Sequence, residues 1–109
     1  AAACAGEQGK FWEYHNYLYG HQQGENEGAF AKQNLKKFAR AVAGIDGAKF
    51  DACLDQERYM NAVRAETAAG RSYGVTGTPA TFITGRLVSG AQPIAAFVSV
   101  IEEELKKSR

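Results

Sequence analysis

The sequence is poor in the features that bring a protein to nucleic acid or into a membrane. Thirteen basic and twelve acidic residues leave a formal net charge of +1, so no strong field would gather nucleic acid or anionic lipid. No apolar run approaches the roughly 20 residues that a membrane span requires. We therefore expect one compact domain of 109 residues, with no nucleic-acid partner and no membrane span in this chain.

The sequence also lacks the motifs of several kinds of site. Its two cysteines, Cys4 and Cys53, form no Cys-x-x-Cys motif and are too few for a zinc site without further ligands. No third group in the sequence is placed to orient His15 or His21 beside a nucleophile. No glycine pattern leads into a helix as a phosphate-binding loop would. We therefore expect no catalytic residue, no metal and no cofactor within this chain.

Helical spacing of apolar residues fills most of the first 73 positions. Residues 1–19 are predicted to form one helix, with Gly6 and Gly9 weakening its first turns. Residues 29–43 form a second, Asp46 caps a third that carries Cys53, and 56–73 form a fourth. The stripe predicted to face inward on the first helix, with His15 as a structural histidine, consists of Cys4, Gln8, Phe11, Trp12, His15, Leu18 and Tyr19.

The helical pattern stops at Gly74-Val75-Thr76-Gly77-Thr78-Pro79. Thr78 precedes a proline and is therefore driven into an extended conformation, and a cis bond is one way for a proline to open a strand. Residues 80–84 then alternate as a strand does, and residues 87–89 return as its hairpin partner. Pro93 suits the first position of a closing amphipathic helix.

Four ordered segments together resemble the DsbA family of thioredoxin-fold thiol-disulfide oxidoreductases. They are the run from Glu7 to His15, the Phe50-Asp51-Ala52-Cys53-Leu54 segment, the Gly-Val-Thr-Gly-Thr-Pro loop, and Gly90-Ala91-Gln92-Pro93 before the last helix. The resemblance covers essentially the whole chain. It implies an incomplete α/β, thioredoxin-like fold of DsbA type, with a helical insertion at 1–73 followed by a cis-proline loop, β-hairpin and C-terminal helix at 74–109.

The resemblance also implies a function and a location. The chain would be part of an extracytoplasmic oxidoreductase acting on protein thiols and disulfides, with the redox Cys-x-x-Cys outside this chain. Thr78 and Pro79 would form the active-site loop that binds the extended backbone of a peptide substrate. Without the redox motif, this chain alone is predicted to be inactive.

The residues alone leave three interpretations of Cys4 and Cys53: separate buried thiols, a structural disulfide between two helices, or a reactive pair. Because members of the resembling family can carry a second disulfide in the helical insertion, the resemblance favours the structural disulfide.

The sequence also leaves two alternatives to the oxidoreductase open. The chain is also consistent with a non-catalytic thioredoxin-like binding or assembly module, and a glutathione-transferase relative would reveal itself by binding glutathione. If no further strand pairs with residues 80–84, the edge from Thr78 to Thr84 is open, and we expect a homodimer in which two such edges meet.

Overall fold

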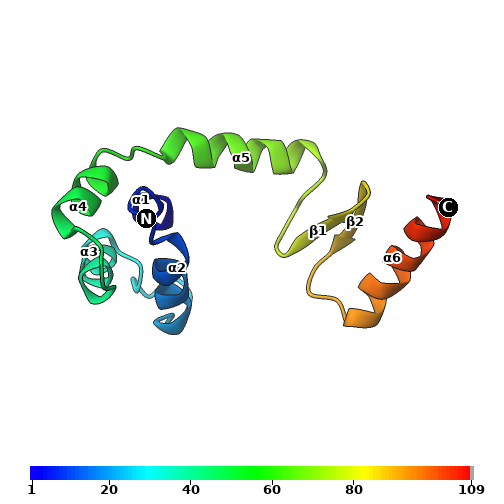
Figure 1. The fold of residues 1–109 in the computed structure, drawn as a ribbon, viewed down its shortest axis with the longest axis horizontal. Helices are drawn as coiled ribbons and strands as arrows, with labels where there is room; N and C mark the ends of the chain where they lie inside the picture. The colour runs from blue at the N-terminus through cyan, green and yellow to red at the C-terminus, as the bar shows by residue number, and fades with distance from the viewer. Residues whose placement is uncertain (109) are drawn as a thin grey trace. The chain divides into compact units, whose positions relative to one another are not determined.

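The computed structural model describes residues 1–108, which form two compact units (Figure 1). The N-terminal unit is Ala1–Val63, and the C-terminal unit begins at Arg64. This differs from the single compact domain with parts 1–73 and 74–109 that the sequence suggests. The boundary lies inside helix α5 (Met60–Ser72). This helix contains no buried residue, so it does not belong as a whole to the core of either unit.

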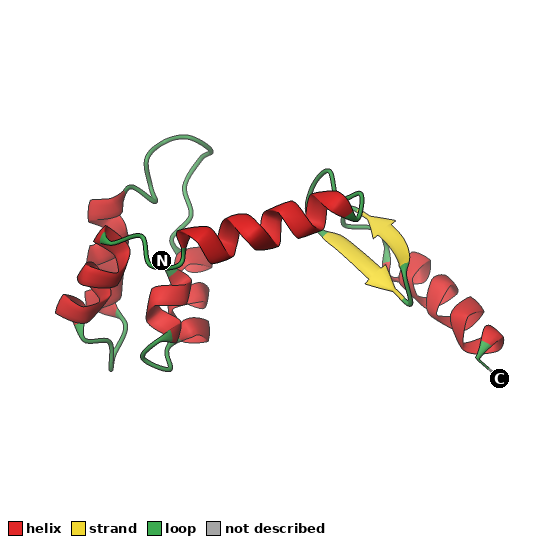
Figure 2. Cartoon of the chain, turned by 90° about the horizontal axis from the view of Figure 1, so that it is seen from above, coloured by secondary structure: helices red, strands yellow, loops and turns green. Residues whose placement is uncertain are grey.

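The N-terminal unit consists of four helices followed by the start of α5: α1 (Ala2–Gly6), α2 (Phe11–Gly20), α3 (Lys32–Ala41) and α4 (Gly47–Asp55). Helix α1 contacts α2 and α4, and α3 contacts the same two helices, so the four close around one core (Figure 2). Its buried residues are Cys4, Ala5, Tyr14, Ala39, Phe50 and Cys53.

The single helix predicted over residues 1–19 is broken in two. Gly9 has φ +72°, the Lys10 N–H donates to the Ala5 carbonyl at 3.0 Å, and the Gly9 N–H donates to the Gly6 carbonyl at 3.0 Å. This pair of hydrogen bonds is the Schellman arrangement, which ends a helix at a left-handed residue. The side chains of α2 therefore do not continue the face that begins at Cys4 on α1.

The break between α1 and α2 changes which face of α2 is buried. Tyr14 is fully buried, whereas Trp12 and Tyr19 keep 66% and 67% of their surface exposed. His15 is only half-buried. The predicted inner stripe of α2 is therefore wrong for these aromatic residues, because the helix that would have carried the phase from Cys4 ends before them.

Helix α4 begins as predicted, and the helix after it starts later than the pattern suggested. The Asp46 side chain accepts a hydrogen bond from the Lys49 N–H at 3.1 Å, which confirms Asp46 as the N-cap. After α4, Glu57 adopts φ +50° and the Arg58 N–H donates to the Cys53 carbonyl at 3.2 Å. This second Schellman arrangement separates α4 from α5, so the helix predicted from residue 56 starts at Met60.

The C-terminal unit contains most of α5, a two-stranded sheet and helix α6 (Ile94–Lys107). Strand β1 (Ala80–Ile83) pairs antiparallel with β2 (Arg86–Ser89), with Thr81 opposite Val88. Thr84 and Gly85 both have positive φ, 46° and 87°, as a two-residue type I′ hairpin requires. Pro93 is the N-cap of α6, one position before the first helical residue.

Candidate functional site

The loop between α5 and β1 presents an exposed backbone. Helix α5 ends with a third Schellman arrangement, in which the Val75 N–H donates to the Gly70 carbonyl at 3.1 Å and Gly74 has φ +92°. The Thr78–Pro79 peptide bond is cis, and both residues are exposed. Within residues 1–108, the N–H and C=O of Thr78 have no hydrogen-bond partner, so both groups are available to a ligand.

The strand that follows this loop has one free edge, because the sheet contains only β1 and β2 among the described residues. The Gly90 N–H donates to the Pro79 carbonyl at 2.8 Å. Hydrogen-bonded pairs alternate along an antiparallel ladder, so Thr81 and Ile83 also bond to β2. The main-chain groups of Ala80 and Phe82 therefore point away from β2, toward the free edge.

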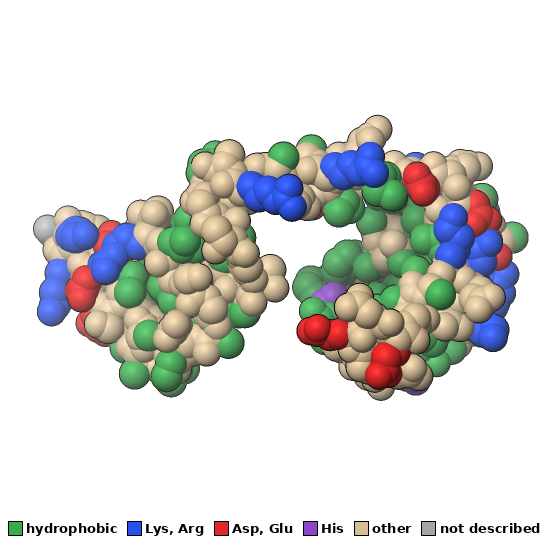
Figure 3. Space-filling view, turned by 180° about the vertical axis from the view of Figure 1, so that it is seen from behind, with side chains coloured by type: hydrophobic (Ala, Val, Ile, Leu, Met, Phe, Trp, Pro, Cys, Tyr) green, Lys and Arg blue, Asp and Glu red, His purple; other side chains and the backbone are tan. Residues whose placement is uncertain are grey.

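Apolar side chains are exposed on the unit that carries this edge. Phe82 is 44% exposed, and its ring meets the ring of Tyr73 in an edge-on contact with centroids 6.4 Å apart. Figure 3 shows hydrophobic side chains at the surface of the unit that carries the C-terminus. Its exposed large apolar residues from β1 onward are Phe82, Leu87, Ile94, Val98, Ile101 and Leu105.

A carboxylate on α6 holds the hairpin turn. Glu104 accepts hydrogen bonds from Lys107 Nζ at 2.9 Å and from Thr84 Oγ1 at 2.8 Å, and Arg86 Nη1 lies 3.3 Å from it. The bonds from Lys107 and Thr84 favour the charged carboxylate and lower the pKa of Glu104 to about 2. Thr84 is thus fixed in its left-handed conformation, and the turn keeps β1 and β2 in register.

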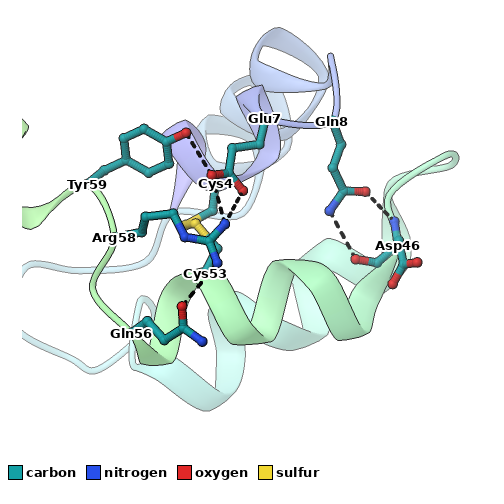
Figure 4. The surroundings of a disulfide bond; sticks show 8 residues. All are labelled: Cys4, Glu7, Gln8, Asp46, Cys53, Gln56, Arg58 and Tyr59. Carbon is teal, nitrogen blue, oxygen red and sulfur yellow. Dashed lines mark hydrogen bonds and ion pairs between the residues drawn. A yellow bond between two sulfur atoms is a disulfide. The ribbon is translucent and has the colours of Figure 1, made fainter.

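The second candidate feature is the disulfide between Cys4 and Cys53, which lies in the N-terminal unit (Figure 4). It joins α1 to α4, with the two Cα atoms 5.8 Å apart. Cys4 is 3% exposed and Cys53 is completely buried. The structure thus contains the pairing that the family resemblance implies, and neither sulfur is an exposed thiolate.

A polar cluster that the sequence did not reveal lies beside this disulfide. Arg58 Nη1 donates to both carboxylate oxygens of Glu7 at 2.9 Å, and the Tyr59 hydroxyl donates to Glu7 Oε1 at 2.9 Å. Arg58 also donates to Gln56 Oε1 at 3.1 Å. The hydrogen bonds from Arg58 and Tyr59 lower the pKa of Glu7, and the bond to Glu7 raises the pKa of Tyr59. The partners are 51 and 52 positions apart, so no local pattern could have indicated them.

The two histidines are not brought together with either cysteine. His15 contacts the rings of Phe11, Trp12 and Tyr19 in an aromatic group on α2. His21 follows the last residue of α2, and its Nδ1 donates to the Tyr17 carbonyl at 2.8 Å. Within residues 1–108, no three His, Cys, Asp or Glu side chains are grouped so that they could hold a metal ion. None of the helices in that part of the chain is long and apolar enough to cross a membrane.

The chain is similar to a known protein family and to segments of known proteins. The model of the DSBA-like thioredoxin domain family matches residues 1–102. The chain is 27% identical over its full length to "Na(+)/H(+) antiporter NhaA" of Herminiimonas arsenicoxydans, and 28% identical to "Na(+)/H(+) antiporter NhaA 3" of Salinispora tropica. It spans only 17% and 16% of the length of these two relatives. No solved structure matches the chain.

Proposed function

The chain belongs to the DSBA-like thioredoxin domain family, and from this membership we propose that it is part of a thiol-disulfide oxidoreductase acting on protein disulfides. In this proposal its own contribution is to bind the substrate. The loop at Thr78 and Pro79, together with the free edge of β1, receives an extended segment of the substrate protein.

The observation that carries this proposal is the set of unpaired main-chain groups at the loop and strand edge. Thr78 has no partner within residues 1–108, and the N–H and C=O groups of Ala80 and Phe82 point away from β2. An extended peptide can add to such an edge as a further strand, and its main-chain hydrogen bonds then supply the affinity. The exposed Phe82 side chain, on a face of the same strand, offers an apolar contact for one substrate side chain.

The redox chemistry has to come from other residues of the parent protein. Attack on a disulfide requires an accessible thiolate, whereas Cys4 and Cys53 are joined to each other and buried. We therefore propose that a Cys-x-x-Cys motif outside these 109 residues performs the exchange. The chain alone is then expected to show no turnover in an insulin-reduction assay, and turnover that Cys4→Ser abolishes would contradict this.

We also propose an extracytoplasmic location for the domain. The support is family membership together with the Cys4–Cys53 disulfide, because disulfides form and persist in oxidising compartments. The matched region makes up only 16–17% of the antiporter relatives, which supports a domain carried by a larger protein.

Peptide titration tests the binding role. The probe is a blocked, cysteine-free peptide of alternating valine and threonine, and amide shifts in the NMR spectrum are followed as it is added. We expect the shifts to concentrate on Thr78, Ala80 and Phe82. Phe82→Pro removes an outward N–H, which an edge strand tolerates, whereas Phe82→Ala removes only the side chain. If the peptide binds the Phe82→Pro variant as tightly as it binds the Phe82→Ala variant, the outward N–H is not used and pairing along this edge is contradicted.

A non-catalytic binding or assembly module is the second candidate, and the open edge of β1 favours it as well. Two strands alone are marginally stable, and an exposed edge is a template for another chain. In this form of the proposal the isolated chain forms a homodimer in which the 78–84 edges of two copies meet about a two-fold axis. Size-exclusion chromatography with light scattering over a range of concentrations should show a dimer that Phe82→Pro weakens. A folded monomer at every concentration would contradict it.

A further inference from the structure

We propose that Glu7, Arg58 and Tyr59 form a clasp that shields the Cys4–Cys53 disulfide from external thiols. The clasp joins the same two segments as the disulfide does: the end of α1 and the turn after α4 (Figure 4). While the clasp is closed, these segments cannot separate to admit a reductant. The disulfide is then a fixed structural bond rather than a redox partner for an exchanging Cys-x-x-Cys.

Local backbone geometry places each half of the clasp next to a cysteine. Glu7 lies one helical turn after Cys4, with its N–H donating to the Ala3 carbonyl at 3.2 Å. Arg58 is held by its own N–H, which donates to the carbonyl of Cys53 at 3.2 Å. The positive φ of Glu57 makes the chain reverse at this point, so that Arg58 and Tyr59 return toward α1.

Each polar group of the clasp has more than one partner. Arg58 is shared between the Glu7 carboxylate and Gln56, and Glu7 accepts from both Arg58 and Tyr59. Close by, the Gln8 side chain accepts from the Asp46 N–H at 2.6 Å and donates to the Asp46 carbonyl at 3.1 Å. These bonds hold α1 to both ends of α4, so opening at the disulfide breaks several hydrogen bonds together.

The reaction that the clasp resists can be written in two steps. A reductant thiolate attacks one Sγ, forms a mixed disulfide, and expels the other cysteine as a thiolate. The second thiol of dithiothreitol then displaces the first cysteine, so the reductant leaves as its cyclic disulfide and two thiols remain on the protein. The first step needs access to a sulfur, yet Cys4 is 3% exposed and Cys53 is not exposed at all.

The test compares rates of reduction by dithiothreitol at neutral pH, with new thiols trapped by alkylation and counted by mass spectrometry. Arg58→Ala should accelerate reduction by up to about fivefold, because solvent screens a pair whose side chains are 45% and 26% exposed. Arg58→Lys, which keeps the charge, should fall between Arg58→Ala and the unaltered protein.

The control is a second arginine–carboxylate pair in the same unit. Arg40 Nη1 and Nη2 lie 2.8 and 2.7 Å from the two carboxylate oxygens of Asp51, and neither residue takes part in the clasp. Arg40→Ala should change the reduction rate by less than about twofold if only local opening exposes the disulfide. Equal acceleration by Arg40→Ala and Arg58→Ala, or none by Arg58→Ala, would overturn the proposal.

A milder variant covers the case in which Arg58→Ala fails to fold. Glu7→Gln keeps the size of the side chain and one oxygen that can accept from Tyr59. It removes the charge opposite Arg58 and one of the two oxygens that accept from Arg58. We expect a several-fold faster reduction with an unchanged far-ultraviolet circular dichroism spectrum. A rate equal to that of the unaltered protein in this folded variant would also overturn the proposal.

Discussion

The two units of this chain differ greatly in how many side chains they bury. The N-terminal unit contains six of the seven buried apolar residues found within 1–108, whereas the C-terminal unit contains only Val88, at 8% exposure. The first unit also has the disulfide and the clasp across it. The second has a two-stranded sheet and two helices without a buried residue.

This difference in burial separates the unit that is stabilised by its own core from the unit that leaves groups free to bind. The N-terminal unit closes on its own core, so its stability depends on contacts within the unit. The C-terminal unit leaves apolar side chains and strand groups unsatisfied, and these are the groups that the proposed function assigns to a ligand or to further strands. Changes in the first unit should therefore act on its own stability, whereas changes at the free edge of β1 should act mainly on association.

Removing the disulfide should have the largest effect. Cys4 and Cys53 close a loop with a sequence separation of 49. On the loop-entropy model, Cys4→Ala with Cys53→Ala should lower the unfolding free energy of the N-terminal unit by up to about 4 kcal/mol. Urea unfolding with hydrogen exchange checks this, and protection at Val88 should stay the same. Equal losses in both units would show that they do not fold independently.

A smaller loss should follow Tyr14→Phe. Tyr14 is completely buried, and its hydroxyl donates to the Leu35 carbonyl at 2.9 Å, which ties α2 to α3. Without the hydroxyl this carbonyl loses its side-chain donor, which should cost about 1–2 kcal/mol in urea unfolding. Tyr19→Phe is the matched control, since Tyr19 is 67% exposed, and should stay within about 0.5 kcal/mol of the unaltered protein.

Acid should act on the C-terminal unit through Glu104. Hydrogen bonds from Lys107 and Thr84 lower its pKa from 4.5 to about 2 in the folded state. Because the folded pKa is the lower one, this contribution to stability is present above pH 4.5 and is lost as the pH falls toward 2. Amide protection in β1 and β2 should weaken over that window.

Glu104→Gln should make the protection of the hairpin less sensitive to acid. Glu102→Gln is the control, because within residues 1–108 its carboxylate makes no hydrogen bond or ion pair. The same pH profile for Glu104→Gln and the unaltered protein would show that Glu104 does not hold the turn.

The smallest effect expected is a gain from Glu57→Gly. Glu57 has φ +50°, which a side chain disfavours and glycine accepts freely. Relief of this strain should exceed the added entropy of the unfolded chain and stabilise the N-terminal unit by about 0.5 kcal/mol in urea unfolding. Lys37→Gly, inside α3, should instead cost about 1 kcal/mol. A loss at both positions would show that Glu57 is not strained.

Local signals in the sequence anticipated much of this fold. Asp46 marks the start of α4 because its side chain caps the helix from within three residues. Gly74 and the threonine–proline pair at 78 and 79 end the helical pattern where α5 stops, and the hairpin follows in the predicted place. The membership of the family could also be inferred, because the matching segments are ordered along the chain.

Features that depend on distant contacts could not be inferred in this way. The sequence predicted only that Gly9 weakens the first helix, whereas its left-handed conformation ends α1, and Tyr14 rather than Trp12 is buried on α2. Glu57 takes a conformation that its residue type does not suggest. The clasp joins Glu7 to Arg58 across 51 positions, so only the folded chain brings its members together.

The shortness of the free edge has a consequence for selectivity. Between Pro79 and the hairpin turn only Ala80 and Phe82 present main-chain groups outward, one N–H and one C=O each. A partner strand bound through so few main-chain hydrogen bonds would be recognised with little dependence on its sequence, and it would dissociate quickly. Under the proposed function, such permissive and brief binding would let the domain engage different polypeptides in turn.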